Sequence, residues 1–106
     1  HGIVANTFWD PQRQELYKMS NLKTRNDASY YGGEPIWITA QKQGIKTGNI
    51  YWVGSDIAVK EQHPTYYHVY DQKPRLTQTE RVAEALRMLK LPDCGTNCRA
   101  TITCLV

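Results

Sequence analysis

The chain has 106 residues, of which 41% are hydrophobic and 22% are charged, a composition typical of a soluble globular protein rather than a disordered or collagen-like one. Its formal net charge of +3 comes from 13 basic and 10 acidic residues scattered along the sequence, so no basic stripe indicates nucleic-acid binding. The sequence also lacks the run of about 18 apolar residues that indicates a membrane span.

The N-terminal segment predicts a β-hairpin followed by a long loop. Residues 3–9 are rich in β-forming side chains, the turn signal Asp10-Pro11 stops this run, and a second short stretch follows at 15–19. Residues 20–29 are polar and lead into Tyr-Tyr-Gly-Gly at 30–33, so we expect a long loop there.

The next segment predicts a helix and then a buried strand. Pro35 suits the first turn of a helix, and Gly44 suits the positive φ that often ends one. Residues 50–53 form an apolar run without alternation, so we expect a strand at residues 48–53 with both faces covered. This order predicts an α/β fold, in which ligands bind beyond the carboxyl ends of the strands.

The clearest predicted element is a helix at residues 78–90. Thr77 and Glu80 have the spacing of a capping box, and Val82, Leu86 and Leu89 repeat at helical spacing. Residues 60–73 before it lack any helical period and are expected to be irregular. The tail after Pro92 contains Cys94, Cys98 and Cys104, whose spacing is poor for zinc, so we expect buried or free thiols.

Three runs of sequence resemble consecutive parts of one enzyme family. They are HGIVANTFWDP (1–11), YYGGEPIWITAQKQGIKTGNIYWVGSD (30–56) and ERVAEALRMLKLP (80–92). In order and spacing they resemble the nucleotide pyrophosphatase/phosphodiesterase family of the alkaline-phosphatase superfamily. The resemblance implies a partial alkaline-phosphatase-like α/β fold over residues 1–92 and a divergent cysteine-rich tail at 93–106. A truncated gene model or a splice product is one explanation of the change at residue 92.

The resemblance also implies an activity. Members of the family hydrolyse phosphodiester and pyrophosphate bonds, including those of nucleotides, with a threonine nucleophile and two zinc ions that clamp the attacking and leaving oxygens. The threonine and zinc-ligand motifs of the family are not among the matching runs, so we expect this chain to bind no zinc and to be inactive alone.

The same resemblance implies an extracellular or membrane-anchored setting and two kinds of partner. They are a nucleotide or other phosphodiester substrate and the rest of the catalytic domain; a nucleic-acid polymer is not expected, nor is a membrane segment in this chain. A piece of such a domain leaves sheet edges and apolar faces unpaired, so we expect marginal stability or self-association.

Five residues carry over to the site. Asn6 stands at the Asn of the family's H-G-I-x-x-N run, whose amide resembles an oxyanion-hole donor to phosphate. Trp52 and Asp56 match the W-x-G-S-D segment that helps to form the base pocket. Tyr70 aligns with an aromatic residue that stacks on the nucleobase, and Arg25 falls near a lysine that contacts substrate phosphates.

Four of the five assignments have a structural alternative. Asn6 is also suited to satisfying a hairpin turn, the two rings to core packing, and Arg25 to a solvated surface position. If these residues form a base pocket, we expect the side chains of Trp52, Asp56 and Tyr70 to lie on one open face beyond the 48–53 strand. Both rings are then partly exposed, with Asn6 on the same side.

Two other functions fit parts of the sequence. A chain with a nucleotide pocket and no catalytic centre is also suited to a non-catalytic nucleotide-binding or interaction role. An N-terminal histidine is also typical of copper monooxygenases, in which His63 or His68 would have to join His1 at the metal.

Overall fold

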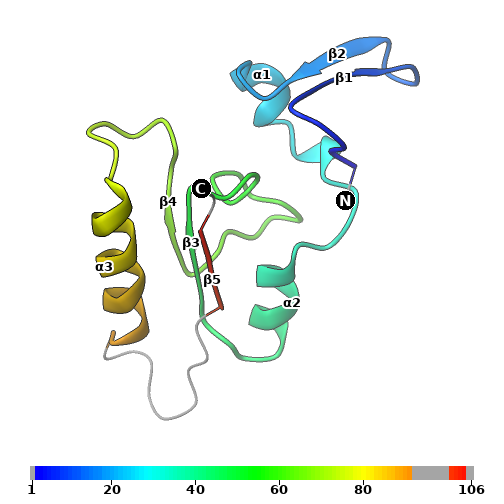
Figure 1. Cartoon of the computed structure of the whole chain (residues 1–106). Helices are drawn as coiled ribbons and strands as arrows, with labels where there is room; N and C mark the ends of the chain where they lie inside the picture. The colour runs from blue at the N-terminus through cyan, green and yellow to red at the C-terminus, as the bar shows by residue number, and fades with distance from the viewer. Residues whose placement is uncertain (1, 92–100, 105–106) are drawn as a thin grey trace.

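The computed structural model describes residues 2–91 and the backbone of residues 101–104. In chain order the elements are β1 (Thr7–Asp10), β2 (Glu15–Lys18), α1 (Leu22–Arg25), η1 (Ala28–Tyr30), α2 (Ile36–Lys42), β3 (Thr47–Ile50), β4 (Tyr66–His68), α3 (Gln78–Leu89) and β5 (Thr101–Cys104). A two-stranded hairpin stands beside a three-stranded sheet of order β4-β3-β5 (Figure 1). The predicted α/β fold is confirmed.

The predicted hairpin is confirmed, and one of its faces builds the first core. β1 pairs with β2 in antiparallel register, which sets Phe8 opposite Tyr17. These rings stack with centroids 4.8 Å apart, and Tyr30 packs edge-on against Tyr17 at 5.0 Å. Trp9 and Leu16 form the neighbouring cross-strand pair and stay exposed, because side chains alternate between the faces of a strand.

The segment predicted as a long loop contains two single turns of helix. Asn21 caps α1 by accepting a hydrogen bond from the backbone N–H of Lys23 at 3.0 Å. Asp27 caps η1 by accepting one from the backbone N–H of Ser29 at 2.9 Å. Polar residues that indicate a loop are also the preferred residues at helix N-termini, which is why the sequence did not reveal these turns.

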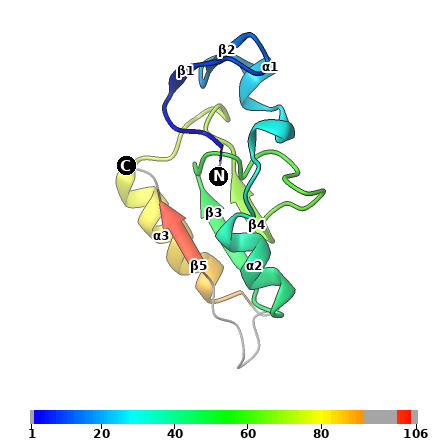
Figure 2. The same cartoon turned by 90° about the vertical axis from the view of Figure 1, so that its right-hand side faces the viewer.

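Strand β3 is buried on both faces, as predicted. On one face Gly48 lies so close to α3 that a Cβ there would be 2.8 Å from the sulfur of Met88. On the other face the hydroxyl of Thr47 donates a 2.6 Å hydrogen bond to Gln41 of α2. The two helices therefore cover opposite faces of the sheet, as Figures 1 and 2 show.

The strand ends at Ile50, three residues before the predicted end. Tyr51 adopts a positive φ of 55°, which takes it out of extended conformation. Its backbone N–H still donates to the carbonyl of His68 at 3.1 Å, and its hydroxyl accepts from the backbone N–H of Leu76 at 2.7 Å. These contacts hold the left-handed residue in place, and an apolar run alone could not indicate them.

Strand β4 lies within the segment that the sequence predicted to be irregular. Its three residues pair in parallel with β3, so that Gly48 stands opposite Tyr66 and Ile50 opposite His68. A strand this short gives no pattern that distinguishes it from a loop. Because β3 and β4 are parallel, the segments that follow them emerge at the same edge of the sheet.

The two main helices confirm the predicted glycine end of α2 and the capping box of α3 and correct the place of Pro35. Gly44 follows α2 with a φ of +77°, and Pro35 is the N-cap of α2 rather than part of its first turn. At α3 the capping box forms in both directions: the Thr77 hydroxyl accepts from the backbone N–H of Glu80, and the Glu80 carboxylate accepts from that of Thr77.

The apolar residues that predicted α3 are not the ones that pack on the sheet. Met88 is 2% exposed and Ala85 is half-buried, and both lie in the cluster around Ile50 and Tyr51. A neighbouring stripe is exposed by 44% to 61% and consists of Val82, Leu86 and Leu89. The helix therefore has two apolar faces, of which one covers the sheet.

The structure describes only part of the C-terminal segment to which the cysteine predictions apply. Cys94 and Cys98 lie outside the described residues, and of Cys104 only the backbone is described, at the end of β5. β5 pairs in parallel with β3. The thiol state and the division at residue 92 stay predictions. Among the described residues, no helix has the length and apolar character to span a membrane.

A first prediction concerns two glycines with positive φ. Gly54 has a φ of +82°, and a Cβ there would lie 2.5 Å from the buried ring of Tyr31, whereas a Cβ at Gly44 meets nothing within 4 Å. Gly44→Ala should cost about 1 kcal/mol from backbone strain alone. Gly54→Ala should cost about 1–3 kcal/mol more from overpacking. Urea unfolding of the two variants measures this difference, and equal midpoints would contradict it.

A cluster of charges links β4 to α3. Nε2 of His68 lies 2.9 Å from Oε1 of Glu84, and Arg87 donates to the same carboxylate at 2.7 and 2.6 Å. The hydrogen bonds from Arg87 and then from His68 lower the pKa of Glu84 from 4.5 to about 2. Because the folded-state pKa of Glu84 is lowered, its ionised carboxylate stabilises the fold at pH values above the ordinary pKa of 4.5. This stabilisation is lost as the pH falls through about 2.

We therefore expect Glu84→Gln to lower the melting temperature at pH 7. The deficit relative to the unsubstituted chain should shrink between pH about 4.5 and pH about 2, the interval set by the two pKa values. Thermal melts across this range measure it. Glu61→Gln is the matched control, because Glu61 is exposed on a loop. A deficit that stays constant with pH would refute the assignment.

Candidate functional site

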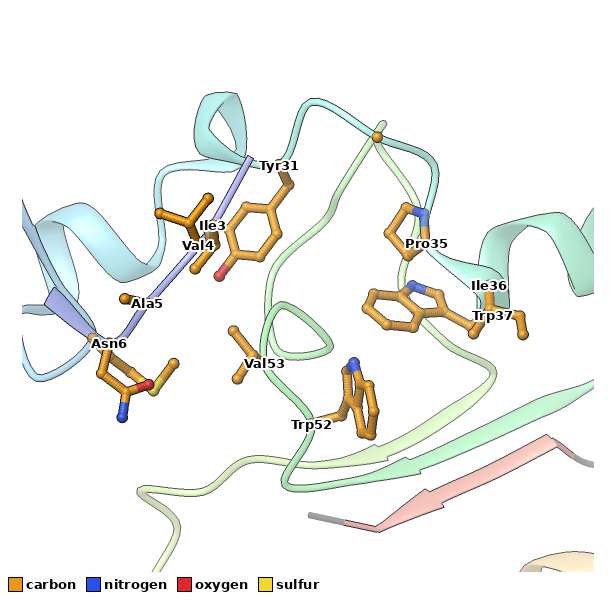
Figure 3. Close-up of a pocket in the computed structure, with 12 residues that line it drawn as sticks. Ile3, Val4, Ala5, Asn6, Tyr31, Pro35, Ile36, Trp37, Trp52 and Val53 are labelled. Atoms are coloured by element: carbon orange, nitrogen blue, oxygen red, sulfur yellow. The ribbon is translucent and has the colours of Figure 1, made fainter. Parts of the chain in front are cut away.

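A cavity of about 390 Å³ lies between the hairpin, the start of α2 and the turn after β3 (Figure 3). Its lining residues are Ile3, Val4, Ala5, Asn6, Met19, Tyr31, Gly33, Pro35, Ile36, Trp37, Trp52 and Val53. Most of these side chains are apolar or aromatic, with few polar groups among them. Such a lining is typical of small-molecule sites, where a few polar groups fix the ligand's orientation.

The hairpin fixes one wall of the cavity. The backbone N–H of Met19 donates a 2.8 Å hydrogen bond to the carbonyl of Asn6, which extends the β1–β2 pairing by one step. Asn6 is exposed and lines the cavity at one end, while Trp37 and Trp52 stand at the other end, with Val53 and Tyr31 between them (Figure 3). The cavity thus brings together two of the five predicted site residues.

The turn after β3 and the start of α2 fix the opposite wall. Trp52 is half-buried and packs against the core that contains Trp37. Trp37 itself is 3% exposed, and its indole Nε1 is buried without a hydrogen-bond partner. Its position is therefore set by packing rather than by hydrogen bonding. Neither indole packs in the cluster around Met88, so α3 does not bury them.

Tyr31 connects this cavity to the next group of predicted residues. Its hydroxyl donates a 3.1 Å hydrogen bond to the backbone carbonyl of Arg25 at the end of α1. Burial is the main cause of the raised pKa of the Tyr31 hydroxyl, which keeps it protonated and able to donate. The cavity wall and the end of α1 are thereby joined.

Arg25 and Asp56 contact each other outside the cavity lining. One guanidinium nitrogen of Arg25 lies 3.8 Å from a carboxylate oxygen of Asp56, and each side chain is only 13% exposed. The same nitrogen lies 2.5 Å from Oδ2 of Asp71. The predicted phosphate-contacting cation is therefore engaged by two carboxylates.

Tyr70 lies apart from the cavity lining but at the same edge of the sheet, since it follows β4 as Trp52 follows β3. It is 51% exposed, and its ring stands perpendicular to Tyr51 at 5.6 Å. The guanidinium of Arg75 lies over the Tyr70 ring at 4.0 Å from its centroid. One face of the ring is thus occupied by a cation.

Sequence reasoning missed most of the cavity wall, including Met19, Tyr31 and Trp37. The two aromatic residues lie inside the matching run at 30–56, but side-chain type alone does not separate a cavity wall from a core. Met19 ends the second hairpin stretch. Its backbone hydrogen bond to Asn6 places it beside that residue in the cavity wall, and the sequence gives no sign of this pairing.

Neither His63 nor His68 belongs to a larger group of metal-ligating side chains among the described residues. No group of three or more His, Cys, Asp or Glu side chains within the described part of the chain is placed to hold a metal ion. His1, on which the copper alternative depends, lies outside the described residues. His63 stacks on Tyr67 with ring centroids 5.0 Å apart, and His68 contacts Glu84.

Comparison with known proteins gives a consistent result. The family model described as type I phosphodiesterase/nucleotide pyrophosphatase matches residues 1–104. A venom phosphodiesterase of Naja atra is 37% identical over 92 residues, which are 87% of this chain and 11% of that protein. Human ectonucleotide pyrophosphatase/phosphodiesterase family member 1 is 35% identical over 92 residues, 87% of this chain and 10% of that protein. The chain thus spans about a tenth of the length of these relatives.

Solved structures give the same match in three dimensions. Murine ectonucleotide pyrophosphatase/phosphodiesterase 5 superposes with a TM-score of 0.75 at 29% identity, covering 96% of this chain and 26% of that one. An inactive form of the same murine protein in complex with AMP superposes equally well, with a TM-score of 0.75 at 29% identity.

Proposed function

This chain belongs to the type I phosphodiesterase/nucleotide pyrophosphatase family and forms part of its alkaline-phosphatase-like fold, and on that premise we propose that it supplies part of a nucleotide pocket. The pocket serves an enzyme that hydrolyses phosphodiester or pyrophosphate bonds of nucleotides. The observation that carries this proposal is the shared cavity of Asn6 and Trp52 in a chain that superposes on an AMP complex.

Asn6 is proposed as the donor to the phosphate. Its exposed amide lies at one end of a largely apolar cavity, where a developing negative charge on a phosphate oxygen gains from a fixed donor. The backbone hydrogen bond from Met19 holds the residue in place without using the side-chain amide. Removal of one such donor typically lowers a rate by about 10²–10³.

Trp52 is proposed to contact the base. It is half-buried at the end of the cavity away from Asn6, so its ring offers a hydrophobic face beside Val53. Asp56 follows in the same turn and is held by Arg25. Tyr70 is proposed as the second aromatic contact, and a base that stacks on the ring face covered by Arg75 has to displace that guanidinium.

Zinc is proposed only for the enzyme as a whole. The described residues provide no set of three ligands, so they do not fit a zinc site, and we assign no step of the reaction to a metal held by them. What this part of the chain does is to orient the substrate through Asn6 and to shield its base from water through the aromatic wall.

The setting and partners follow the same premise. Relatives include ectonucleotide pyrophosphatases and venom phosphodiesterases, which supports an extracellular or membrane-anchored location for the parent protein. The rest of the catalytic domain is the proposed structural partner, and the exposed stripe on α3 is consistent with further layers of fold. A non-catalytic nucleotide-binding role is the alternative and uses the same cavity.

We expect the purified chain to bind AMP and Trp52→Ala to weaken binding by about fivefold or more, because base stacking on an aromatic ring contributes about 1–3 kcal/mol. Titration calorimetry measures both affinities. Trp9→Ala is the matched control, since Trp9 is 58% exposed on the hairpin and outside the cavity lining. Equal losses in the two variants would argue against the cavity as the binding site.

The chain supplied with zinc should not hydrolyse a chromogenic nucleotide phosphodiester. A single amide donor assists a reaction only when a nucleophile and its activating metals are already present. The measurement is product release above the uncatalysed rate, with AMP binding recorded on the same preparation. Zinc-dependent turnover by the chain would disprove this expectation and favour a complete catalytic centre.

A further inference from the structure

Arg25 occupies an unusual position for a cation that was expected to meet substrate. Its side chain is 13% exposed, its Nε is buried without a hydrogen-bond partner, and one terminal nitrogen contacts both Asp56 and Asp71. Two carboxylates compensate one guanidinium, so the group carries no unopposed positive charge towards a phosphate. A buried guanidinium with these partners is better suited to holding protein segments together.

The three residues come from three separate segments. Arg25 ends α1, Asp56 follows β3, and Asp71 follows β4. Because β3 and β4 are parallel, Asp56 and Asp71 emerge at the same edge of the sheet, and Arg25 reaches both from the hairpin side. These contacts therefore tie the hairpin and both loops together at the edge where ligands bind in α/β sheets.

The same contacts run between two parts of the proposed site. On one side the Tyr31 hydroxyl of the cavity wall donates to the Arg25 carbonyl. On the other side Asp71 lies next to Tyr70 in sequence and 4.0 Å from Arg75, the residue that covers the Tyr70 ring. The hydrogen bond from Arg25 holds the pKa of Asp71 below its ordinary value, so the carboxylate stays charged at neutral pH.

We propose that Arg25 is a positioning residue whose guanidinium clasps Asp56 and Asp71 and thereby holds the Tyr70 loop beside the Trp52 cavity. This inference rests on the proposed nucleotide-binding function. It assigns to Arg25 a role through other residues rather than a contact with substrate phosphate. The Arg25 clasp, defined as Arg25, Asp56 and Asp71, sets the distance between the two aromatic contacts that enclose a base.

The first arm of the test is hydrogen exchange without nucleotide. The backbone N–H of Gln72 donates to the carbonyl of Val69 and that of Leu76 to the hydroxyl of Tyr51, so both amides report on this loop. Asp71→Ala should accelerate their exchange by about tenfold, since the loop opens locally more often. Asp71 is 48% exposed, and Arg25 keeps its contact with Asp56 in this variant, so the substitution should spare the fold.

Three further variants make this arm specific. Glu61→Ala removes one negative charge from an exposed loop position and should leave both amides unchanged. Arg25→Gln should accelerate the same amides, and adding Asp71→Ala to it should give less than the sum of the two separate effects, because both changes remove the contact between Arg25 and Asp71. Exchange in Asp71→Ala that equals exchange in Glu61→Ala overturns the clasp, as do additive effects of the two clasp substitutions.

The second arm is AMP affinity, measured by calorimetry on the same variants. If the binding-competent loop falls to about a fifth of the population, the affinity of Asp71→Ala falls about fivefold, and Glu61→Ala keeps the affinity of the unsubstituted chain. Faster exchange with unchanged AMP affinity overturns the positioning role. An unsubstituted chain that binds no AMP contradicts the proposed function instead, and the exchange arm then decides on the clasp alone.

Discussion

The structure depends on one constraint, the burial of β3 on both faces. A strand without an exposed face needs a layer on each side, and here α2 and α3 supply the two layers. Gly48 permits close approach of Met88 on one face, and Thr47 satisfies its hydroxyl with Gln41 on the other. With the strand fixed in this way, the segments that leave its carboxyl end are forced towards the hairpin, and the cavity forms where they meet.

Local chemistry explains which elements the sequence could predict. The capping box of α3, the glycine after α2 and the Asp10-Pro11 turn act within a few residues, so their patterns survive in sequence and each was confirmed. The failures in the sheet involve distant contacts. The early end of β3 at Tyr51 is stabilised by His68 and Leu76, and the three-residue β4 exists because β3 is available to pair with it.

The candidate site shows the same difference between residues that the sequence identified and contacts that depend on the fold. Asn6 and Trp52 were assigned by resemblance, and the fold brings them to one cavity, although their roles remain proposals. The contact of Arg25 with Asp56 could not be predicted from the sequence, because a charged residue in a polar loop resembles any solvated side chain. Pairing across three segments depends on the relative placement of hairpin and sheet, which no local pattern encodes.

The second apolar face of α3 affects the thermal behaviour of the chain. Val82, Leu86 and Leu89 are 44% to 61% exposed in the native state, so unfolding adds less to their contact with water than it adds for buried side chains. Because newly exposed apolar surface is the main positive source of the heat-capacity change of unfolding, these side chains contribute less to that change than buried ones do. The stability of this chain should therefore vary with temperature along a flatter curve than that of a 106-residue domain whose helices bury every apolar stripe.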